Sequence, residues 1–201
     1  NMEKKLREKF ILIATMSIFI VMAIVLGIMN LTSRSMENSQ INYSLDIITA
    51  GGGTITQGTD TDKEDEDIAS YGTTYGPEYR FSIRYFSALI NKNGAIDSAN
   101  TENISAISEK EATQWIEKLS AGSKDTGRLR IADSYYQYKA TKQSNGETLF
   151  VAVDCTDNVR SMHQVLVFSF RMGILCILFF IIVVTLLSKR VIRPFARNIE
   201  N

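Results

Sequence analysis

The 201-residue sequence has few of the residues on which enzyme sites are usually built. It contains one histidine, His163, and two cysteines, Cys155 and Cys176. A Ser-His-Asp set, a cluster of spaced metal ligands and a glycine-rich phosphate loop are all missing, so the sequence predicts no catalysis. His163 stands two residues before a long apolar run and is expected to be solvated, with a pH-responsive role as the alternative.

Charged residues are missing from two long stretches, 10–29 and 172–187. Between the apolar blocks, residues 32–164 hold 13 basic and 19 acidic residues, a net charge of −6, although the whole chain sums to zero. Two such runs exclude a plain soluble globule, which would expose too much hydrocarbon. The acidic middle region argues against nucleic acid as a partner, because it would repel phosphate.

Each apolar block is long enough to cross a bilayer. Residues 10–29 would form a helix about 30 Å long. A cleaved signal peptide is the alternative, although its apolar region is usually shorter, about 7–15 residues. The second block, Val165–Leu187, would reach about 34 Å and contains Arg171, whose long side chain can extend to the nearer headgroups. For this block the alternative is a buried helix of a soluble protein.

The segments outside both blocks are basic. Residues 1–9 carry four basic and two acidic residues, and residues 188–201 carry four basic residues and one acidic residue. Because basic flanks stay in the cytoplasm, both termini are expected there, with residues 32–164 outside a multi-pass membrane protein. The residues expected to anchor the second span are Arg171, Lys189 and Arg190. Cys155 and Cys176 would then lie apart and pack as small apolar residues.

The middle region predicts an α+β domain with an antiparallel sheet. Residues 31–48 have loosely helical spacing and should continue the first span outward. Residues 50–67 are rich in glycine, threonine and acids and are expected to form a loop. A cation site in this loop is the weaker alternative, because the spacing of a calcium loop is missing. Its acids are Asp60, Asp62, Glu64, Asp65, Glu66 and Asp67.

Alternating apolar residues over 79–90 predict a long strand with a bulge or with both faces partly covered. The turn Asn91–Gly94 and a short strand over 95–98 would follow. Further strands are predicted at 127–131 and 134–141. After the turn at 144–146, the apolar run Leu149–Val153 is typical of a central strand covered on both faces.

Helices are predicted on either side of these later strands. Ser108 and Glu111 form a capping box for a helix whose apolar face includes Trp115, a core residue first and a ligand platform second. Gly122 would end that helix. Asp157 would cap a last helix, unbroken over Val159–Ile192 and with Pro194 close behind it.

A basic and aromatic group of residues is the candidate ligand site. Arg80 and Arg84 are four apart on the predicted first strand, and Arg128 and Arg130 are two apart on another, so each pair would share a face. Arginine forks and tyrosine hydroxyls suit a carboxylate or phosphate. A solvated sheet face with cross-strand pairs to acids is the alternative. The candidates are Arg80, Arg84, Arg128, Arg130, Tyr135, Tyr136 and Tyr138.

Small residues recur in both spans, as Ala23-x-x-x-Gly27 and Ser169-x-x-x-Gly173. Such patterns let membrane helices approach closely. They suggest a homodimer formed through the spans.

The layout of tail, span, outer domain, span and basic exit resembles the sensor half of a bacterial two-component histidine kinase of clostridial and related Gram-positive type. The segments that carry the resemblance are Arg84–Ser87, Asn93–Asp97, Asn103–Ser108, Gly127, Tyr136–Tyr138, Leu149–Cys155 and Arg193–Ala196. The resemblance implies a PAS-like (Cache) extracytoplasmic domain flanked by two transmembrane helices. It also implies an extracellular stimulus that is not identified.

On this interpretation the chain divides into seven segments. They are a cytoplasmic tail (1–9), a transmembrane helix (10–30), a juxtamembrane helix with the Gly/Asp-rich loop (31–74), the sensor domain (75–157), a linking helix (158–164), a transmembrane helix (165–187) and the start of a cytoplasmic signalling helix (188–201).

The resemblance also predicts what this piece lacks. The sequence has no phosphoacceptor motif and no ATP-binding glycine box, so it is expected to be a truncated piece with no cofactor of its own, starting at Asn1 as a cleaved tag would leave it. ATP and Mg, and a cognate response regulator, are implied for the parent kinase. The alternative is a non-catalytic membrane receptor, such as a chemoreceptor, or an adhesion or accessory module.

Overall fold

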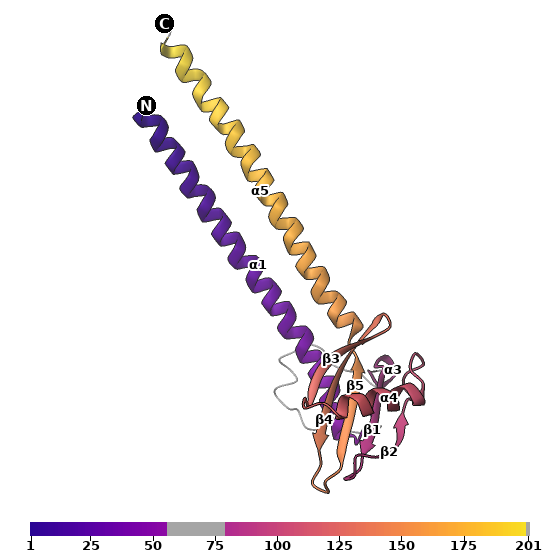
Figure 1. Ribbon diagram of the computed structural model, residues 1–201. Helices are drawn as coiled ribbons and strands as arrows, with labels where there is room; N and C mark the ends of the chain where they lie inside the picture. The colour runs from indigo at the N-terminus through magenta and orange to yellow at the C-terminus, as the bar shows by residue number, and fades with distance from the viewer. Residues whose placement is uncertain (56–78, 200–201) are drawn as a thin grey trace, which may run out of the picture. The chain divides into compact units, whose positions relative to one another are not determined.

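The computed structural model describes residues 1–55 and 79–199 (Figure 1). Its helices are α1 (Met2–Ala50), α3 (Tyr79–Ser82), α4 (Glu109–Ser120) and α5 (Thr156–Ile199). Its strands are β1 (Tyr85–Ile90), β2 (Ile96–Asn100), β3 (Thr126–Ile131), β4 (Ser134–Lys142) and β5 (Thr148–Asp154). The chain divides into two compact units, Ser35–Arg160 and the helical Asn1–Arg34 with Ser161–Asn201.

The five strands form one antiparallel sheet in the order β2-β1-β5-β4-β3. Two hairpins, β1–β2 and β3–β4, flank β5, which pairs with both. The turn between β3 and β4 is Ala132–Asp133, and Ala132 has a positive φ of 53°, as the first residue of a tight two-residue hairpin loop can require. The predicted α+β class and the antiparallel sheet are confirmed.

Both faces of β5 are covered, as its continuous apolar sequence predicted. Phe150 and Ala152 belong to a core that includes Ala112 and Ile116 of α4. Leu149, Val151 and Val153 belong to a second core on the opposite face. There they lie with three residues from the last turns of α1, which are Ile41, Leu45 and Ile48. One helix therefore covers each face of the central strand.

The turn after α1 is fastened to the sheet. The buried Ser87 hydroxyl donates to the Gly53 carbonyl over 2.6 Å, and the Ile55 N–H donates to the Tyr85 hydroxyl over 3.1 Å. Gly53 has a φ of +101°, and a Cβ there would lie 2.9 Å from the Ser87 hydroxyl, so glycine is needed on both counts. Of the predicted loop 50–67, Ala50 ends the helix, and the six acids lie outside the described residues.

The predicted strand over 79–90 is wrong in its first half. Tyr79–Ser82 is a short helix, and β1 begins only at Tyr85. Phe81 is exposed whereas Ile83 is buried, so their alternation with Tyr85 came from a helical turn and a link and not from a strand. From Tyr85 onward the expectation holds, because both faces of β1 are largely buried and its register against β2 shifts near Ala88.

The capping box of α4 is confirmed, since Ser108 and Glu111 each accept a hydrogen bond from the other's backbone N–H. Two details of this helix are corrected. Trp115 is only half-buried, with the Lys118 ammonium 5.0 Å from its ring centre, and smaller neighbours fill the core. The helix ends on Ala121 in a right-handed conformation, and Gly122 does not adopt a positive φ.

The two long helices continue beyond their apolar blocks. Helix α1 is unbroken through Ala50, which confirms the predicted continuation over 31–48. Helix α5 begins at Thr156, so Asp157 lies in its first turn and is not its cap. The predicted unbroken helix over Val159–Ile192 is confirmed, but it does not end before Pro194 and continues to Ile199. By length and composition, α1 and the segment Thr156–Arg190 of α5 are each able to cross a membrane.

Candidate functional site

Three of the candidate ligand residues share one face of the sheet. Arg128 and Arg130 of β3 lie opposite Gln137 and Tyr135 of β4 in the register, so these four side chains project to the same side. The Arg130 guanidinium lies 5.6 Å from the centre of the Tyr135 ring. Arg130 also donates to the Ala132 carbonyl and is 3.6 Å from the exposed Asp133 carboxylate. The Arg130 guanidinium therefore has its ion-pair and hydrogen-bond partners within the β3–β4 hairpin.

Tyr136 and Tyr138 lie on the other face, in the core beside α4. The Tyr138 ring stacks on Phe150 with centres 5.5 Å apart, and Phe86 packs against Phe150 and Tyr136. Burial, and then the nearby Asp154 carboxylate, raise the pKa of Tyr136. These tyrosines pack the domain and do not join a ligand site on the arginine face, which corrects the predicted grouping.

Arg84 and Arg80 do not lie on a common strand. Arg84 is an exposed residue of the link before β1, and Arg80 belongs to the short helix α3. The shared face predicted from their spacing of four is wrong because the chain between them is not extended. The seven candidates are therefore divided between both faces of the sheet and the approach to β1.

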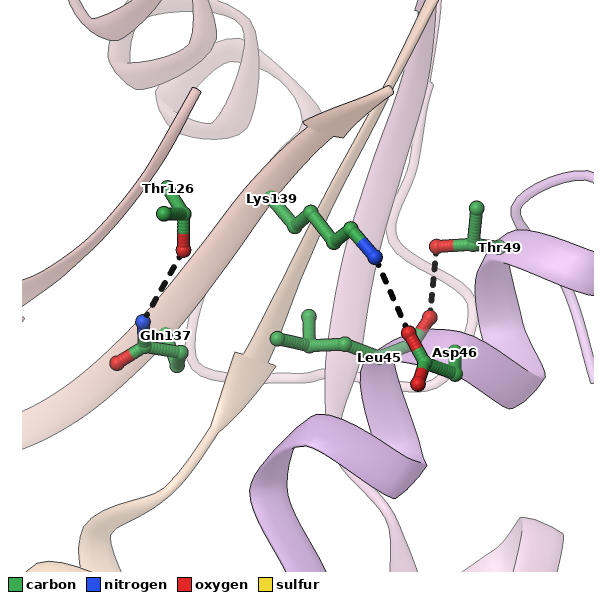
Figure 2. A network of polar contacts seen from close by, with 6 residues as sticks. All are labelled: Leu45, Asp46, Thr49, Thr126, Gln137 and Lys139. Carbon is green, nitrogen blue, oxygen red and sulfur yellow. Dashed lines mark hydrogen bonds and ion pairs between the residues drawn. The ribbon is translucent and has the colours of Figure 1, made fainter. Parts of the chain in front are cut away.

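The arginine face of the sheet meets the last turns of α1. Arg128 donates to the Gln137 side chain over 3.1 Å and to the Asn38 side chain of α1 over 3.2 Å. One strand along, the Lys139 ammonium is 3.1 Å from the Asp46 carboxylate (Figure 2). The basic residues of β3 and β4 thus hold a helix, and neither the predicted anion site nor cross-strand acids account for these contacts.

The first turn of α5 is joined to α1 in the same unit. The Asn158 amide donates to the Glu37 carboxylate over 2.6 Å and to the Gln40 side chain over 3.2 Å. The Asp154 carboxylate accepts from both the N–H and the hydroxyl of Thr156. The contact of Asn158 with α1 was not predicted from the sequence, because no local pattern shows which distant helix a polar side chain will contact.

A cleft of about 530 Å³ opens beside these contacts, within Ser35–Arg160. Its volume is in the range of small-molecule sites. Two arginines and three aspartates line it together with uncharged polar residues. The charged residues are Arg84, Arg160, Asp133, Asp154 and Asp157. Arg160 and Asp157 are 3.9 Å apart and both largely exposed, so the cleft is polar and of mixed charge. Among the described residues, no group of three or more His, Cys, Asp or Glu could hold a metal ion.

Cys155 is the single residue between β5 and α5. Its side chain is fully buried in the second core, and its N–H donates to the Tyr135 carbonyl. Burial raises the pKa of the Cys155 thiol. The predicted role as a small packing residue is confirmed for Cys155, while Cys176 is exposed on the apolar part of α5. His163 is exposed, as expected.

The three predicted anchors, Arg171, Lys189 and Arg190, are exposed on α5. Large apolar residues are also exposed on both long helices, including Phe19, Ile24, Phe170 and Phe179. Apolar surface of this extent on helices of this length favours membrane association.

No family model, curated protein or solved structure matches this chain.

Proposed function

We propose that the chain is the transmembrane signal-sensing region of a receptor, with Ser35–Arg160 as an outer sensor domain. The observation that carries the proposal is the way in which the two apolar helices are built into that domain. The end of α1 supplies Ile41, Leu45 and Ile48 to the core against β5. Helix α5 starts one residue after β5 ends.

Such a connection suits a protein that passes a displacement along a helix. The first turn of α5 is held to β5 through Asp154 and Thr156, and to α1 through Asn158. No loop separates the sheet from α5, so a shift of β5 on ligand binding would move the helix start directly. The stimulus must favour one of two helix arrangements over the other.

In its finer form, the proposal is that the parent protein is a homodimeric two-component sensor histidine kinase. The quoted motifs and the basic segments beside both apolar blocks support it. Both termini would be cytoplasmic in the plasma membrane of a bacterium, and the outer domain would be PAS-like (Cache). An extracellular stimulus would control ATP- and Mg-dependent autophosphorylation and transfer to a response regulator. In such a parent protein, these activities would belong to kinase domains that this sequence does not contain.

Cysteine labelling in intact cells tests the orientation. In a Cys176→Ser background, where Cys155 is buried, a cysteine at Ser123 should react with an impermeant maleimide and one at Ser188 should not. A second maleimide treatment after lysis provides the control that Ser188→Cys is reactive once exposed. The reverse labelling would end the sensor proposal.

The full-length protein decides between receptor classes. Radiolabel transfer from ATP to a histidine beyond residue 201, in membranes, would support the kinase. Long heptad repeats with methylated Gln or Glu in that region would instead support a chemoreceptor. If that region had neither a phosphorylated histidine nor such repeats, an adhesion or accessory module would remain.

A further inference from the structure

A polar pair joins the two apolar helices within the unit formed by Asn1–Arg34 and Ser161–Asn201. The Asn30 amide donates to the Ser169 hydroxyl over 2.9 Å and to the Leu26 carbonyl over 2.8 Å. The Ser169 hydroxyl donates in turn to the Val165 carbonyl over 2.7 Å. Every polar hydrogen of the two side chains is therefore used.

Other hydroxyls on the apolar segments do not make such a link. Thr15, Ser17 and Thr185 each donate to the carbonyl four residues earlier in their own helix. Within the described part of this unit, the bond from Asn30 to Ser169 is the side-chain hydrogen bond that crosses between α1 and α5.

Close packing shields the pair. Ser169 is 3% exposed, although it lies on a helix whose other faces are open. One turn further along α5, a Cβ on Gly173 would lie 3.3 Å from the Leu26 side chain, so the helices approach closely there. Ser169 and Gly173 thus serve the contact within one chain, whereas Gly27 has open space around it. Asn30 is half-buried, and the buried Ser169 hydroxyl has no water with which to replace the Asn30 amide.

We propose that the hydrogen bond from Asn30 to Ser169 is a register lock, which holds α1 and α5 in one axial alignment and must break when the receptor changes state. This inference rests on the proposed signalling function and names the element that sets its resting state. A shift of either helix by one turn, about 5.4 Å, takes this 2.9 Å hydrogen bond well out of range. The hydrogen bond therefore favours one axial alignment of α1 and α5 over an alignment one turn away, and it opposes gradual sliding of one helix along the other.

The test measures the alignment in full-length protein in membranes. In a Cys176→Ser background, a disulfide between Leu26→Cys and Gly173→Cys reports the resting alignment, and one between Met22→Cys and Gly173→Cys reports an alignment one turn away. Cysteine pairs are oxidised with copper phenanthroline, and intrachain products are quantified by mass spectrometry. Ser169→Ala and Asn30→Ala are compared with Ser17→Ala, which removes a hydroxyl bonded only within its own helix.

The lock predicts that Ser169→Ala and Asn30→Ala each change the ratio of the two disulfides by about three- to twentyfold, the range of interhelical hydrogen bonds in membranes. The double variant should change the ratio no more than either single variant, and Ser17→Ala should leave it unchanged. Basal autophosphorylation should shift in the two single variants as well. A ratio unaffected by Ser169→Ala would overturn the lock.

The two readouts separate this inference from the proposed function. A changed ratio with unchanged output, in a protein whose wild type is active, would overturn the lock as a switch while leaving the sensor intact. A wild type with no stimulus-dependent output would overturn the sensor function and with it the role of the lock in signalling.

Discussion

Gly127 lies directly opposite Tyr138 in the β3–β4 pair. A Cβ at Gly127 would approach the Tyr138 hydroxyl to 2.8 Å and two ring carbons to 3.0 Å. The missing side chain lets the ring lie across β3 and stack on Phe150 in the core. Glycine is needed here to leave space for the Tyr138 ring. It is not needed for backbone conformation, because Gly127 does not have a positive φ.

Gly127→Ala should destabilise the domain by about 1–3 kcal/mol, the usual cost of inserting a methyl group into a packed core. The Tyr138 ring cannot swing away freely, because it is buried against Phe150. Trp115, the single tryptophan, lies on α4, so urea unfolding followed by its fluorescence reports on this domain. Gly27→Ala, with open space at its Cβ, should leave the midpoint unchanged. An equal effect of both substitutions would contradict the steric argument.

Two buried groups give the domain a dependence on alkaline pH. Burial raises the pKa of Cys155 from its ordinary value of 9.0 and that of Tyr136 from 10.0. The unfolded chain therefore loses these protons first, and stability present below about pH 9 should fall as the pH rises further.

The urea midpoint of Trp115 fluorescence, measured from about pH 7 to about pH 10.5, checks this expectation. Tyr136→Phe should flatten the fall above about pH 10, because it removes one of the two groups. A midpoint that does not change up to the highest pH would show that both groups ionise as freely in the folded chain as in the unfolded one.

Local patterns predicted some of these side chains and not others. The reciprocal bonds of Ser108 and Glu111 follow from their spacing. The packing role of Cys155 follows from the lack of a cysteine with which it could pair, because an unpaired cysteine is usually a small buried residue. The tyrosines could not be assigned in the same way. Tyr135 and Tyr136 are neighbours on one strand and must point to opposite faces. Which helix covers each face is decided by α4 and α1, and the strand sequence carries no information about them.

Two adjacent residues in the last turns of α1, Leu45 and Asp46, make different kinds of contact; both are labelled in Figure 2. Leu45 is 2% exposed in the core beside β5. Asp46, the next residue, reaches the Lys139 ammonium at the surface, where both side chains are substantially exposed. The apolar contact should provide most of the stability, since exposed ion pairs are screened by water.

Leu45→Ala should therefore destabilise the domain by about 2–5 kcal/mol, and Asp46→Ala by less than about 1 kcal/mol. Thermal or urea unfolding, again read from Trp115, compares the two at adjacent positions on one helix. Added salt should weaken the small effect of Asp46→Ala and leave that of Leu45→Ala nearly unchanged. A larger loss from Asp46→Ala would mean that α1 is held mainly by charge.

The helices and strands were predicted better than their contacts. The strands after residue 95, the start of α4 and the outward extension of α1 all followed from periodicity and capping. The half-strand over 79–84 failed, because a few alternating residues also fit a helical turn followed by a link. That α1 and α4 cover opposite faces of β5 depends on contacts between distant residues. A polar row such as Arg128, Gln137 and Lys139 indicates a solvated strand face as readily as a helix-binding one.

Arg171 is the only charged residue of the second apolar block, Val165–Leu187, on helix α5. If α5 crosses a membrane as proposed, Arg171 and the pair Lys189 and Arg190 fix its depth from opposite sides. Small changes of depth or tilt cost only fractions of a kcal/mol per Å. A receptor whose states differ by a few kcal/mol would respond to such a bias.

Arg171→Leu should therefore change basal autophosphorylation of the full-length protein in membranes, by about two- to tenfold. The outer domain should stay folded, as judged by Trp115 fluorescence. Lys124→Leu, in an exposed loop of the domain, is the matched loss of a cation and should leave the output unchanged. Normal insertion of Arg171→Leu with wild-type output would refute the anchoring argument.

The order of the strands has a consequence for how the protein is made. The central strand β5 is the last of the five in the chain, and it pairs with β1, about 60 residues earlier. As the chain leaves the ribosome, the two hairpins exist first as separate, half-exposed pieces, and neither can be completed without β5. Distant pairings of this kind form slowly. The domain therefore closes only as the start of α5 emerges behind it, so a nascent chain halted before Thr148 should still be sensitive to protease, and one halted well after Asp154 should be resistant.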